Sequence, residues 1–358
     1  MALDLTATER QRYARHLALD EIGTSGQLAL KNARVLVVGC GGLGSPLALY
    51  LAAAGVGNLT LVDGDSVELS NLQRQILFGD RQLGAAKAIA GAERLQALNG
   101  DIEVTPIAAH LDTGNGPSLI AEADLVVDCS DNFTTRYLIN DLCLELSKPW
   151  LFAAINGFEG SLSLFTPGAA CFRCLYPLQP VVANCNSGGV LGVVPGIIGL
   201  LQAGEALKYL LGIPGGADGQ LLLFDALQPT LRAIRLVADP TCSCRTAVAA
   251  PTARQAPDRA PSCTISWTAW QLLAAEQDGV LVDIRSEAEH RARNVGGARL
   301  EAEQLATFVA SCGPRPIGLY CRSGKRSLRL ARALRDGGFA NLYSIAGGID
   351  AHPGKAGP

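Results

Sequence analysis

Runs of apolar residues that predict buried strands alternate along the chain with longer segments that predict helices. Residues 34–38 include four consecutive aliphatic side chains, which is typical of a parallel strand buried on both faces. Small and aliphatic residues at helical length follow in 45–54, and residues 59–62 predict the next strand. Further strands are predicted at 102–104 and 125–127. This alternation predicts a doubly wound, Rossmann-like α/β sheet.

The C-terminal part repeats this pattern on a smaller scale. Residues 280–284 and 317–320 predict buried strands, and residues 327–334 predict a helix. Residues 246–263 are rich in Ala, Pro, Thr and Arg, so we interpret them as a linker that could reach on the order of 50 Å. The chain is therefore predicted to contain two α/β domains, 1–245 and 264–358.

Composition limits the classes of partner and compartment. Of the 358 residues, 48% are hydrophobic and 18% are charged, as in a globular protein. The net charge of -3 gives no electrostatic reason to expect nucleic acid or an anionic membrane as a partner. The apolar run at 190–201 is too short to span a bilayer, so we expect a buried core helix or a subunit contact. Without a secretory signal, the eleven cysteines are predicted to be metal ligands or catalytic thiols in a reducing cytoplasm.

A glycine-rich loop lies between the first predicted strand and the first predicted helix of this sheet. It consists of Gly39, Cys40, Gly41, Gly42, Leu43 and Gly44. In this position, backbone N–H groups and the helix N-terminus can bind phosphates. Asp63 ends the second strand, where a carboxylate can accept hydrogen bonds from ribose hydroxyls. Both features fit an ATP-binding enzyme and an NAD-dependent dehydrogenase.

The residues around the loop favour ATP. Four polar or cationic side chains follow the second strand, and they suit a triphosphate better than a dinucleotide. They are Asn71, Arg74, Gln75 and Lys87. Asp131 and Asn132 follow the strand that ends near residue 128, where a carboxylate can hold Mg²⁺ on the phosphates. Each residue alone could be an ordinary surface residue, but the whole set indicates ATP with Mg²⁺.

Together with Tyr13-Ala14-Arg15, these motifs resemble the MoeB/ThiF family of activating enzymes in order and spacing, from about residue 10 to residue 245. The resemblance implies a homodimer that uses ATP to adenylate the C-terminal glycine of a ubiquitin-like sulfur carrier protein ending in Gly-Gly, with release of pyrophosphate.

The resemblance also implies roles for individual residues. Arg15 would contact phosphate from the opposite subunit, Arg74 and Lys87 would bind phosphates, and Asp131 would bind Mg²⁺. His16 stands where the family often has glutamine, a difference that we do not expect to affect function.

Two cysteine pairs are candidate metal ligands. Cys171 and Cys174 form the first pair, and Cys242 and Cys244 form the second. Four thiolates make a closed, structural Zn²⁺ site, and the family resemblance implies such a site. The second pair has one intervening residue where the family has two, so its backbone would have to turn for both thiols to bind one ion. The alternative is four buried or free thiols.

Other cysteines differ in their predicted roles. Cys185 lies in a polar, glycine-rich segment, where the family places a cysteine that can form a transient persulfide or acyl link. We hypothesise a resolving thiol there; the alternative is a cysteine without a chemical role, because no neighbouring base is visible. Cys40, Cys129 and Cys143 occupy strand-end or helical core contexts, so we interpret them as packing residues.

The C-terminal domain carries a second reactive loop, which begins at Cys321 directly after a predicted strand. Backbone N–H groups, with the charges of Arg322, Lys325 and Arg326, would stabilise a thiolate and then an anionic persulfide. On this loop the domain resembles a single-domain rhodanese.

Three other segments bear on the rhodanese resemblance. Asp283 and Arg285 match the family's Asp-x-Arg and are expected to brace the fold, and residues 346–349 fit the family's ending. The usual Gly-His-Ile-Pro-Gly-Ala is replaced at residues 293–298, which we expect to affect stability or the surface more than catalysis.

Together, the two domains predict an adenylyltransferase and sulfurtransferase. A persulfide on Cys321 would attack the carrier's acyl-adenylate, release AMP and leave a thiocarboxylate. A cysteine desulfurase or another donor would supply the sulfur. Carriers of the molybdopterin, thiamine, cysteine, siderophore and tRNA-thiolation pathways all fit. Two alternatives stay open: a rhodanese domain that only recruits a sulfurtransferase, and the NAD-dependent dehydrogenase.

Overall fold

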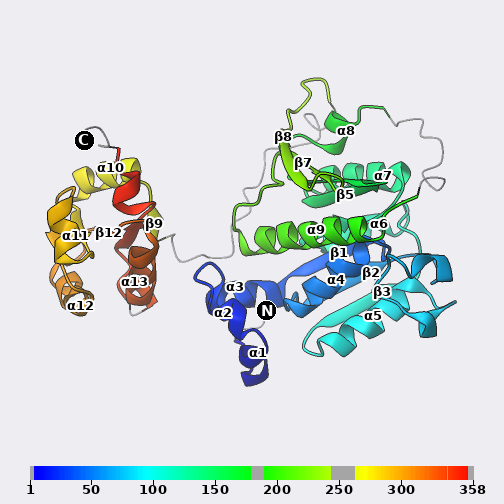
Figure 1. The fold of residues 1–358 in the computed structure, drawn as a ribbon, viewed down its shortest axis with the longest axis horizontal. Helices are drawn as coiled ribbons and strands as arrows, with labels where there is room; N and C mark the ends of the chain where they lie inside the picture. Colours follow the sequence, from blue (N-terminus) through cyan, green and yellow to red (C-terminus); the bar gives the residue numbers. More distant parts are fainter. Residues whose placement is uncertain (1–3, 179–188, 243–262, 337, 354–358) are drawn as a thin grey trace. The chain divides into compact units, whose positions relative to one another are not determined.

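The protein consists of two compact units, Met1–Arg254 and Gln255–Pro358. The computed structural model describes residues 4–178, 189–242, 263–336 and 338–353. The predicted linker at 246–263 lies outside these residues except for Cys263. Figure 1 shows the helices and strands of both units.

An eight-stranded sheet forms the centre of the first unit, in the order β3-β2-β1-β4-β5-β6-β7-β8. Its strands are β1 Arg34–Val38, β2 Asn58–Val62, β3 Glu103–Ile107, β4 Leu125–Asp128, β5 Trp150–Asn156, β6 Glu159–Phe165, β7 Gln220–Asp225 and β8 Thr230–Arg235. The strands from β3 to β5 are parallel, which confirms the predicted doubly wound half. The antiparallel β6, β7 and β8 were not predicted.

Helices cover both faces of this parallel half (Figure 1). The described helices of the unit are α1 Ala7–Arg12, α2 Ala14–Leu17, α3 Gly23–Asn32, α4 Gly44–Ala53, α5 Lys87–Leu98, α6 Gly116–Glu122, α7 Phe133–Glu145, α8 Phe172–Leu175 and α9 Val193–Leu211, with 3₁₀ turns η1 Leu69–Asn71 and η2 Asp80–Gln82. The apolar run at 190–201 begins α9, as expected for a core helix. Its Val194 and Ile198 are fully buried.

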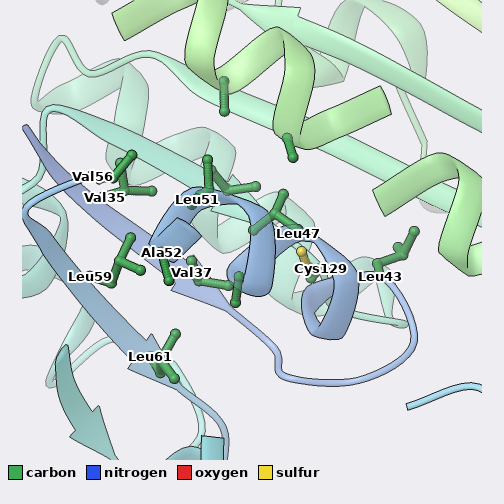
Figure 2. Close-up of a cluster of buried hydrophobic side chains, with 14 of the residues drawn as sticks. Val35, Val37, Leu43, Leu47, Leu51, Ala52, Val56, Leu59, Leu61 and Cys129 are labelled. Carbon is green, nitrogen blue, oxygen red and sulfur yellow. The ribbon is translucent and has the colours of Figure 1, made fainter. Parts of the chain in front are cut away.

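Alternate residues of β1 belong to different cores, which explains why the strand is apolar throughout. Val35 and Val37 pack in the core between the sheet and α4, which Figure 2 shows in close-up. Leu36 and Val38 pack in a second core on the opposite face. The sheet is therefore buried on both sides, and its strands end at a shared edge where loops can carry functional residues.

The second unit has a five-stranded parallel sheet in the order β11-β10-β12-β13-β9. Its strands are β9 Thr264–Ile265, β10 Val280–Asp283, β11 Ala298–Arg299, β12 Ile317–Tyr320 and β13 Leu342–Ile345. Its helices are α10 Trp267–Gln277, α11 Glu287–Ala292, α12 Ala302–Ser311 and α13 Lys325–Asp336, with the 3₁₀ turn η5 Gly348–Ala351. The predicted strands and helix of this domain are confirmed. In neither unit do the described residues include a helix that is long and apolar enough to cross a membrane.

Candidate functional site

The glycine loop joins β1 to α4 at the carboxyl edge of the parallel strands. Gly39 has φ +97°, and a Cβ atom there would lie 2.7 Å from the carbonyl oxygen of Cys129. A Cβ atom on Gly44 would lie 2.0 Å from the carbonyl oxygen of Gly39. These two positions exclude side chains because the loop turns tightly against itself and against the end of β4. Gly41 differs, since a Cβ atom there would meet only the Gln75 amide, at 3.7 Å.

Asp63 holds this loop in place from the end of β2. Its Oδ2 accepts a hydrogen bond from the Cys40 N–H at 2.7 Å, and its Oδ1 accepts one from the Asp65 N–H at 2.9 Å. Each carboxylate oxygen has a second lone pair, so the group can still accept hydrogen bonds from a ligand. The sequence predicted the position of Asp63 but not this support of the loop.

Three of the four predicted polar and cationic residues lie close to these groups. The Gln75 amide is beside Gly41, and the Arg74 side chain comes within 3.5 Å of a Cβ atom placed on Gly42. The Lys87 ammonium lies 2.9 Å from Asp65 Oδ2. The fourth residue, Asn71, is buried, and its Oδ1 accepts the Glu68 N–H at 3.3 Å.

Asp131 and Asn132 follow β4, next to the loop. Both are exposed. Asn132 caps α7, because its Oδ1 accepts the Thr135 N–H at 2.8 Å. The Cys129 carbonyl faces Gly39, so the chain brings Asp131 to the same edge as the glycine loop.

Sequence reasoning missed a buried pair beneath Asp131, formed by Asp128 and Arg136. The Arg136 Nε lies 3.4 Å from Asp128 Oδ2. Burial raises the pKa of the Asp128 carboxyl, while Arg136 and the donors of Ser130 act in the opposite direction. An Asp at the end of a strand with Ser two residues later was the available signal, because this pattern forms local side-chain turns.

These groups fit a nucleoside triphosphate with Mg²⁺. The glycine loop offers backbone N–H groups without intervening side chains, and α4 begins directly behind it. Carboxylate oxygens are the ligands that Mg²⁺ prefers, and Asp131 offers an exposed one.

Arg15 follows Tyr13, whose ring lies at the opposite end of α4 from this loop. Arg15 is exposed on α2. The neighbouring Tyr13 accepts a hydrogen bond from Asn99 at 2.8 Å, and its ring excludes any side chain at Gly55, just after α4. Because α4 has ten residues, its two ends are about 15 Å apart.

Three of the four predicted zinc ligands meet in a cluster. The Cys171 sulfur lies 3.8 Å from that of Cys174 and 3.6 Å from that of Cys242. A tetrahedral zinc site with Zn–S bonds of about 2.3 Å needs sulfur atoms about 3.8 Å apart, so these residues fit zinc. Burial raises the pKa of the Cys171 thiol to about 12. Cys244, like Cys185, lies outside the described residues.

The chain turns just before Cys242, the described member of the second cysteine pair; the turn expected between Cys242 and Cys244 lies outside the described residues. Asp239 Oδ1 accepts the Thr241 N–H at 2.8 Å, and the Cys242 N–H donates to the Asp239 carbonyl at 3.1 Å. The Asp239 N–H points at the Cys174 sulfur, at 3.4 Å. A backbone donor of this kind supports a metal-bound thiolate.

We predict that the protein contains one zinc ion per chain and that Cys174→Ser lowers zinc affinity by more than about 100-fold, because it removes a ligand rather than a supporting contact. Metal analysis after dialysis against a chelator, with thermal unfolding, measures this. Cys263→Ser is the matched control, since that thiol lies in the second unit. Unchanged zinc content in Cys174→Ser would contradict the prediction.

The buried packing cysteines behave as predicted. Cys40, Cys129 and Cys143 are buried, and burial raises the pKa of all three thiols. Raised pKa values make these thiols poor nucleophiles at neutral pH.

Cys321 has the opposite character. It lies between β12 and α13 and is only 1% exposed. Burial acts to raise the pKa of its thiol, but the backbone N–H groups of Gly324, Arg326 and Ser327 and the Ser327 hydroxyl outweigh it, so the pKa lies below its usual value. The Ser327 Oγ is 3.7 Å from the sulfur. The loop therefore favours a thiolate at this position.

Two of the cations of this loop have carboxylates beside them. The Arg322 Nε lies 3.7 Å from Asp350 Oδ2, and the Arg326 Nη2 donates to Glu289 Oε1 at 3.0 Å. Because neighbouring carboxylates offset both charges, stabilisation of the Cys321 thiolate depends mainly on the hydrogen-bond donors. That the side-chain charges of Arg322, Lys325 and Arg326 also stabilise the thiolate stays a prediction.

Asp283 and Arg285 brace the fold, as expected. Both are buried, and the Arg285 Nη2 donates to Asp283 Oδ2 at 2.7 Å and to the Arg293 carbonyl at 2.6 Å. His290 also contacts Asp283 Oδ2, at 2.7 Å. The segment that departs from the family pattern is thus tied to β10 through this network.

The ending at 346–349 packs on the reactive loop. The Ile349 N–H donates to the Cys321 carbonyl at 2.8 Å, and a Cβ atom on Gly348 would lie 2.2 Å from that carbonyl. Gly348, with φ +55°, leaves the space that the loop needs.

We predict that Ser327→Ala moves the titration of the Cys321 thiol to higher pH. The change removes one donor that lowers the pKa and keeps the backbone donors. Since the thiolate exists above the pKa, less of it forms at neutral pH. NMR titration of isotope-labelled cysteine measures this, with Ser311→Ala as the control, because that exposed hydroxyl donates to the Phe308 carbonyl of its own helix. An unchanged titration in Ser327→Ala would refute the assignment.

The fold and the two sites define a protein of two α/β units, of which one carries a glycine-rich loop that fits a nucleotide and the other carries a thiol with a lowered pKa. Comparison with protein families agrees with this division. The ThiF family model matches residues 13–246, and the rhodanese-like domain model matches residues 268–352. The chain belongs to the ThiF family and carries a rhodanese-like domain.

Individual relatives cover one or both units. The chain is 46% identical to the SAMP-activating enzyme E1 of Haloferax volcanii over 245 residues, which is 68% of this chain and 91% of the relative. It is 37% identical to adenylyltransferase and sulfurtransferase MOCS3-1 of Zea mays, with 95% of this chain and 80% of the relative covered. Among solved structures, E. coli MccB with ATP superposes with a TM-score of 0.58 at 25% identity, covering 65% of this chain and 73% of that chain.

Proposed function

We propose that this protein is an adenylyltransferase and sulfurtransferase that activates a ubiquitin-like sulfur carrier protein with ATP and then converts its C-terminal carboxylate to a thiocarboxylate. The observation that carries the proposal is the thiol of Cys321, held in a cradle of donors on the same chain as a phosphate-binding glycine loop. The names of the Haloferax volcanii and Zea mays relatives support both halves of this reaction.

In the first step, the carrier's terminal carboxylate attacks the α-phosphate of ATP, and pyrophosphate leaves. The N–H groups of the glycine loop bind phosphate, Asp63 binds the ribose, and Arg74 and Lys87 offset the charge that moves onto pyrophosphate. Mg²⁺ held by Asp131 would supply further charge stabilisation on the phosphates. A carboxylate is a poor electrophile, and adenylation gives it a good leaving group.

In the second step, a terminal persulfide sulfur on Cys321 attacks the acyl-adenylate carbonyl. The carbon–oxygen bond to AMP breaks, and the carrier becomes joined to Cys321 through an acyl disulfide. A second thiol, which we assign to Cys185, attacks the Cys321 sulfur, releases the thiocarboxylate and leaves a disulfide that a cellular thiol reduces. A cysteine desulfurase or a similar donor restores the persulfide. This chemistry suits the reducing cytoplasm.

Carrier-dependent ATP–pyrophosphate exchange tests the proposal. We expect exchange with a small ubiquitin-like protein that ends in Gly-Gly and none with the same protein lacking those two residues. Equal exchange with and without the two terminal glycines, or binding of NAD in place of ATP, would overturn the proposal.

The position of Arg15 supports a site completed by a second subunit. In its own chain Arg15 follows Tyr13, whose ring lies against Gly55, at the far end of α4 from the glycine loop. In a two-fold symmetric dimer, each subunit can offer the same residue to the other. We therefore assign Arg15 to the phosphates of the partner's ATP.

We predict that Arg15→Ala and Asp131→Ala each reduce exchange by on the order of 100-fold, as for loss of a group that stabilises developing charge. An equimolar mixture of the two variants should recover about a quarter of wild-type activity, because half of the dimers are mixed and each mixed dimer has one complete site of two. Subunit mixing followed by the exchange assay measures this. No recovery in verified mixed dimers would place Arg15 in its own subunit's site.

A further inference from the structure

The turn after β4 is held by an aspartate that no solvent reaches. Asp128 is fully buried, and its Oδ1 accepts hydrogen bonds from the Ser130 N–H at 2.9 Å and the Ser130 hydroxyl at 2.6 Å. Two donors on one residue fix the backbone of the turn on its amide side.

Arg136 holds Ser130 as well, through the Ser130 carbonyl group. Its Nη2 donates to the Ser130 carbonyl at 2.8 Å, and its Nε lies 3.4 Å from Asp128 Oδ2. The guanidinium carbon lies 5.4 Å from the ring centre of Phe133 and 5.3 Å from that of Phe152. The guanidinium group is therefore held by its ion pair with Asp128, by its hydrogen bond to the Ser130 carbonyl and by cation–π contacts with the two rings. Only 7% of Arg136 is exposed.

The residues on both sides of Asp131 are held by hydrogen bonds. The Ser130 carbonyl belongs to the peptide that leads into Asp131, and Asn132 on the other side caps α7. The side chain of Asp131 is exposed, and among the described residues no hydrogen bond or ion pair holds it. Its direction therefore depends on the backbone on either side.

We propose that Arg136 is a positioning residue for Asp131: by holding the Ser130 carbonyl against Asp128, it sets the direction in which the Asp131 carboxylate projects beside the glycine loop. This inference rests on the proposed function for the role of Asp131 as a Mg²⁺ ligand, but not for the effect of Arg136 on the backbone. A ligand carboxylate must be aimed accurately, since Mg²⁺ tolerates little deviation from octahedral geometry.

The first experiment needs no nucleotide. Amide hydrogen exchange is measured residue by residue in wild type and in Arg136→Lys, which keeps the charge but cannot make both contacts while stacking on the two rings. We expect exchange at the Ser130 amide, which donates to Asp128, and at the Thr135 amide, which donates to Asn132, to accelerate at least about tenfold, with the amides of β1 unchanged. Unchanged exchange at both residues, or equal acceleration throughout the unit, would overturn the proposal.

The second experiment measures metal binding rather than turnover. Mn²⁺ is titrated into protein saturated with a non-hydrolysable ATP analogue. We expect the apparent Kd for Mn²⁺ to rise at least about tenfold in Arg136→Lys, with the metal-free affinity for the analogue unchanged. A purely structural defect would weaken both, and equal weakening would count against a positioning role.

Two further variants keep the result interpretable. Ser130→Ala removes one donor to Asp128 and leaves the Ser130 carbonyl for Arg136, so it should have the weaker effect of the two. Lys148→Gln is the matched control, because Lys148 also donates to a backbone carbonyl, that of Ala123 at 2.8 Å, but away from the turn. If wild type binds no nucleotide, the proposed function fails while the hydrogen-exchange result still decides the role of Arg136.

Discussion

Replacing Cys321 with alanine is expected to reduce thiocarboxylate formation by on the order of 10³-fold or more, while carrier-dependent pyrophosphate exchange continues at the wild-type rate. The two steps use different units, and only the second needs a sulfur nucleophile. The thiol is prepared for this role because the donors of its loop lower its pKa. Mass spectrometry of the carrier after a single incubation with ATP and a sulfur donor measures the product.

The control for this change is Cys263→Ala, a partly exposed thiol of the same unit that lies outside the reactive loop. It should leave both activities intact. If Cys321→Ala still yields thiocarboxylate at the wild-type rate, the rhodanese-like unit recruits a separate sulfurtransferase. Loss of exchange as well as transfer would mean that the two steps are not separable in the way that we propose.

Two glycines of the nucleotide loop are expected to respond differently to alanine. Gly44→Ala places a Cβ atom 2.0 Å from the Gly39 carbonyl oxygen, so the backbone must move. We expect a loss of roughly 1–3 kcal/mol or more in the free energy of unfolding. Gly41→Ala meets only an ordinary contact at 3.7 Å, so the fold should stay stable. Its added methyl group would still obstruct a phosphate, and we expect ATP binding to weaken by roughly ten- to a hundredfold.

Thermal unfolding without ligand and calorimetric ATP titration separate these effects. Gly100→Ala serves as the control, because a Cβ atom there meets nothing within 4 Å. A stable Gly41→Ala protein with wild-type ATP affinity would show that phosphate does not approach the loop at this point. Wild-type stability of Gly44→Ala would show that the loop relaxes at little cost.

The parallel strands were predictable because their residues carry the signal locally. β1 has aliphatic side chains at consecutive positions, since both of its faces meet a core. The antiparallel strands were less visible. All six residues of β8 are exposed, so it shows no burial pattern, and its place is set by pairing with β7.

Some residues of the site could be found from their neighbours in the sequence, and others only from contacts with distant parts of the chain. The glycine loop, Asp63 and Cys321 could be found because each follows a predicted strand directly. Arg136 could not, because its function depends on contacts with the Ser130 carbonyl and the ring of Phe152, which come from different elements. Similarly, the exposed cations beside Cys321 suggested an electrostatic effect, but pairing with Asp350 and Glu289 offsets two of them.

By itself, the sequence determined which residues can do chemistry: glycines that admit phosphate, carboxylates at strand ends, and cysteines in two kinds of setting. Only the tertiary structure decided the pKa values of those groups and the directions in which their side chains point. Burial raises the pKa of the thiol at Cys40, whereas backbone donors lower that of Cys321. A residue type does not show this difference, because a pKa depends on the desolvation and hydrogen bonds that distant parts of the chain provide.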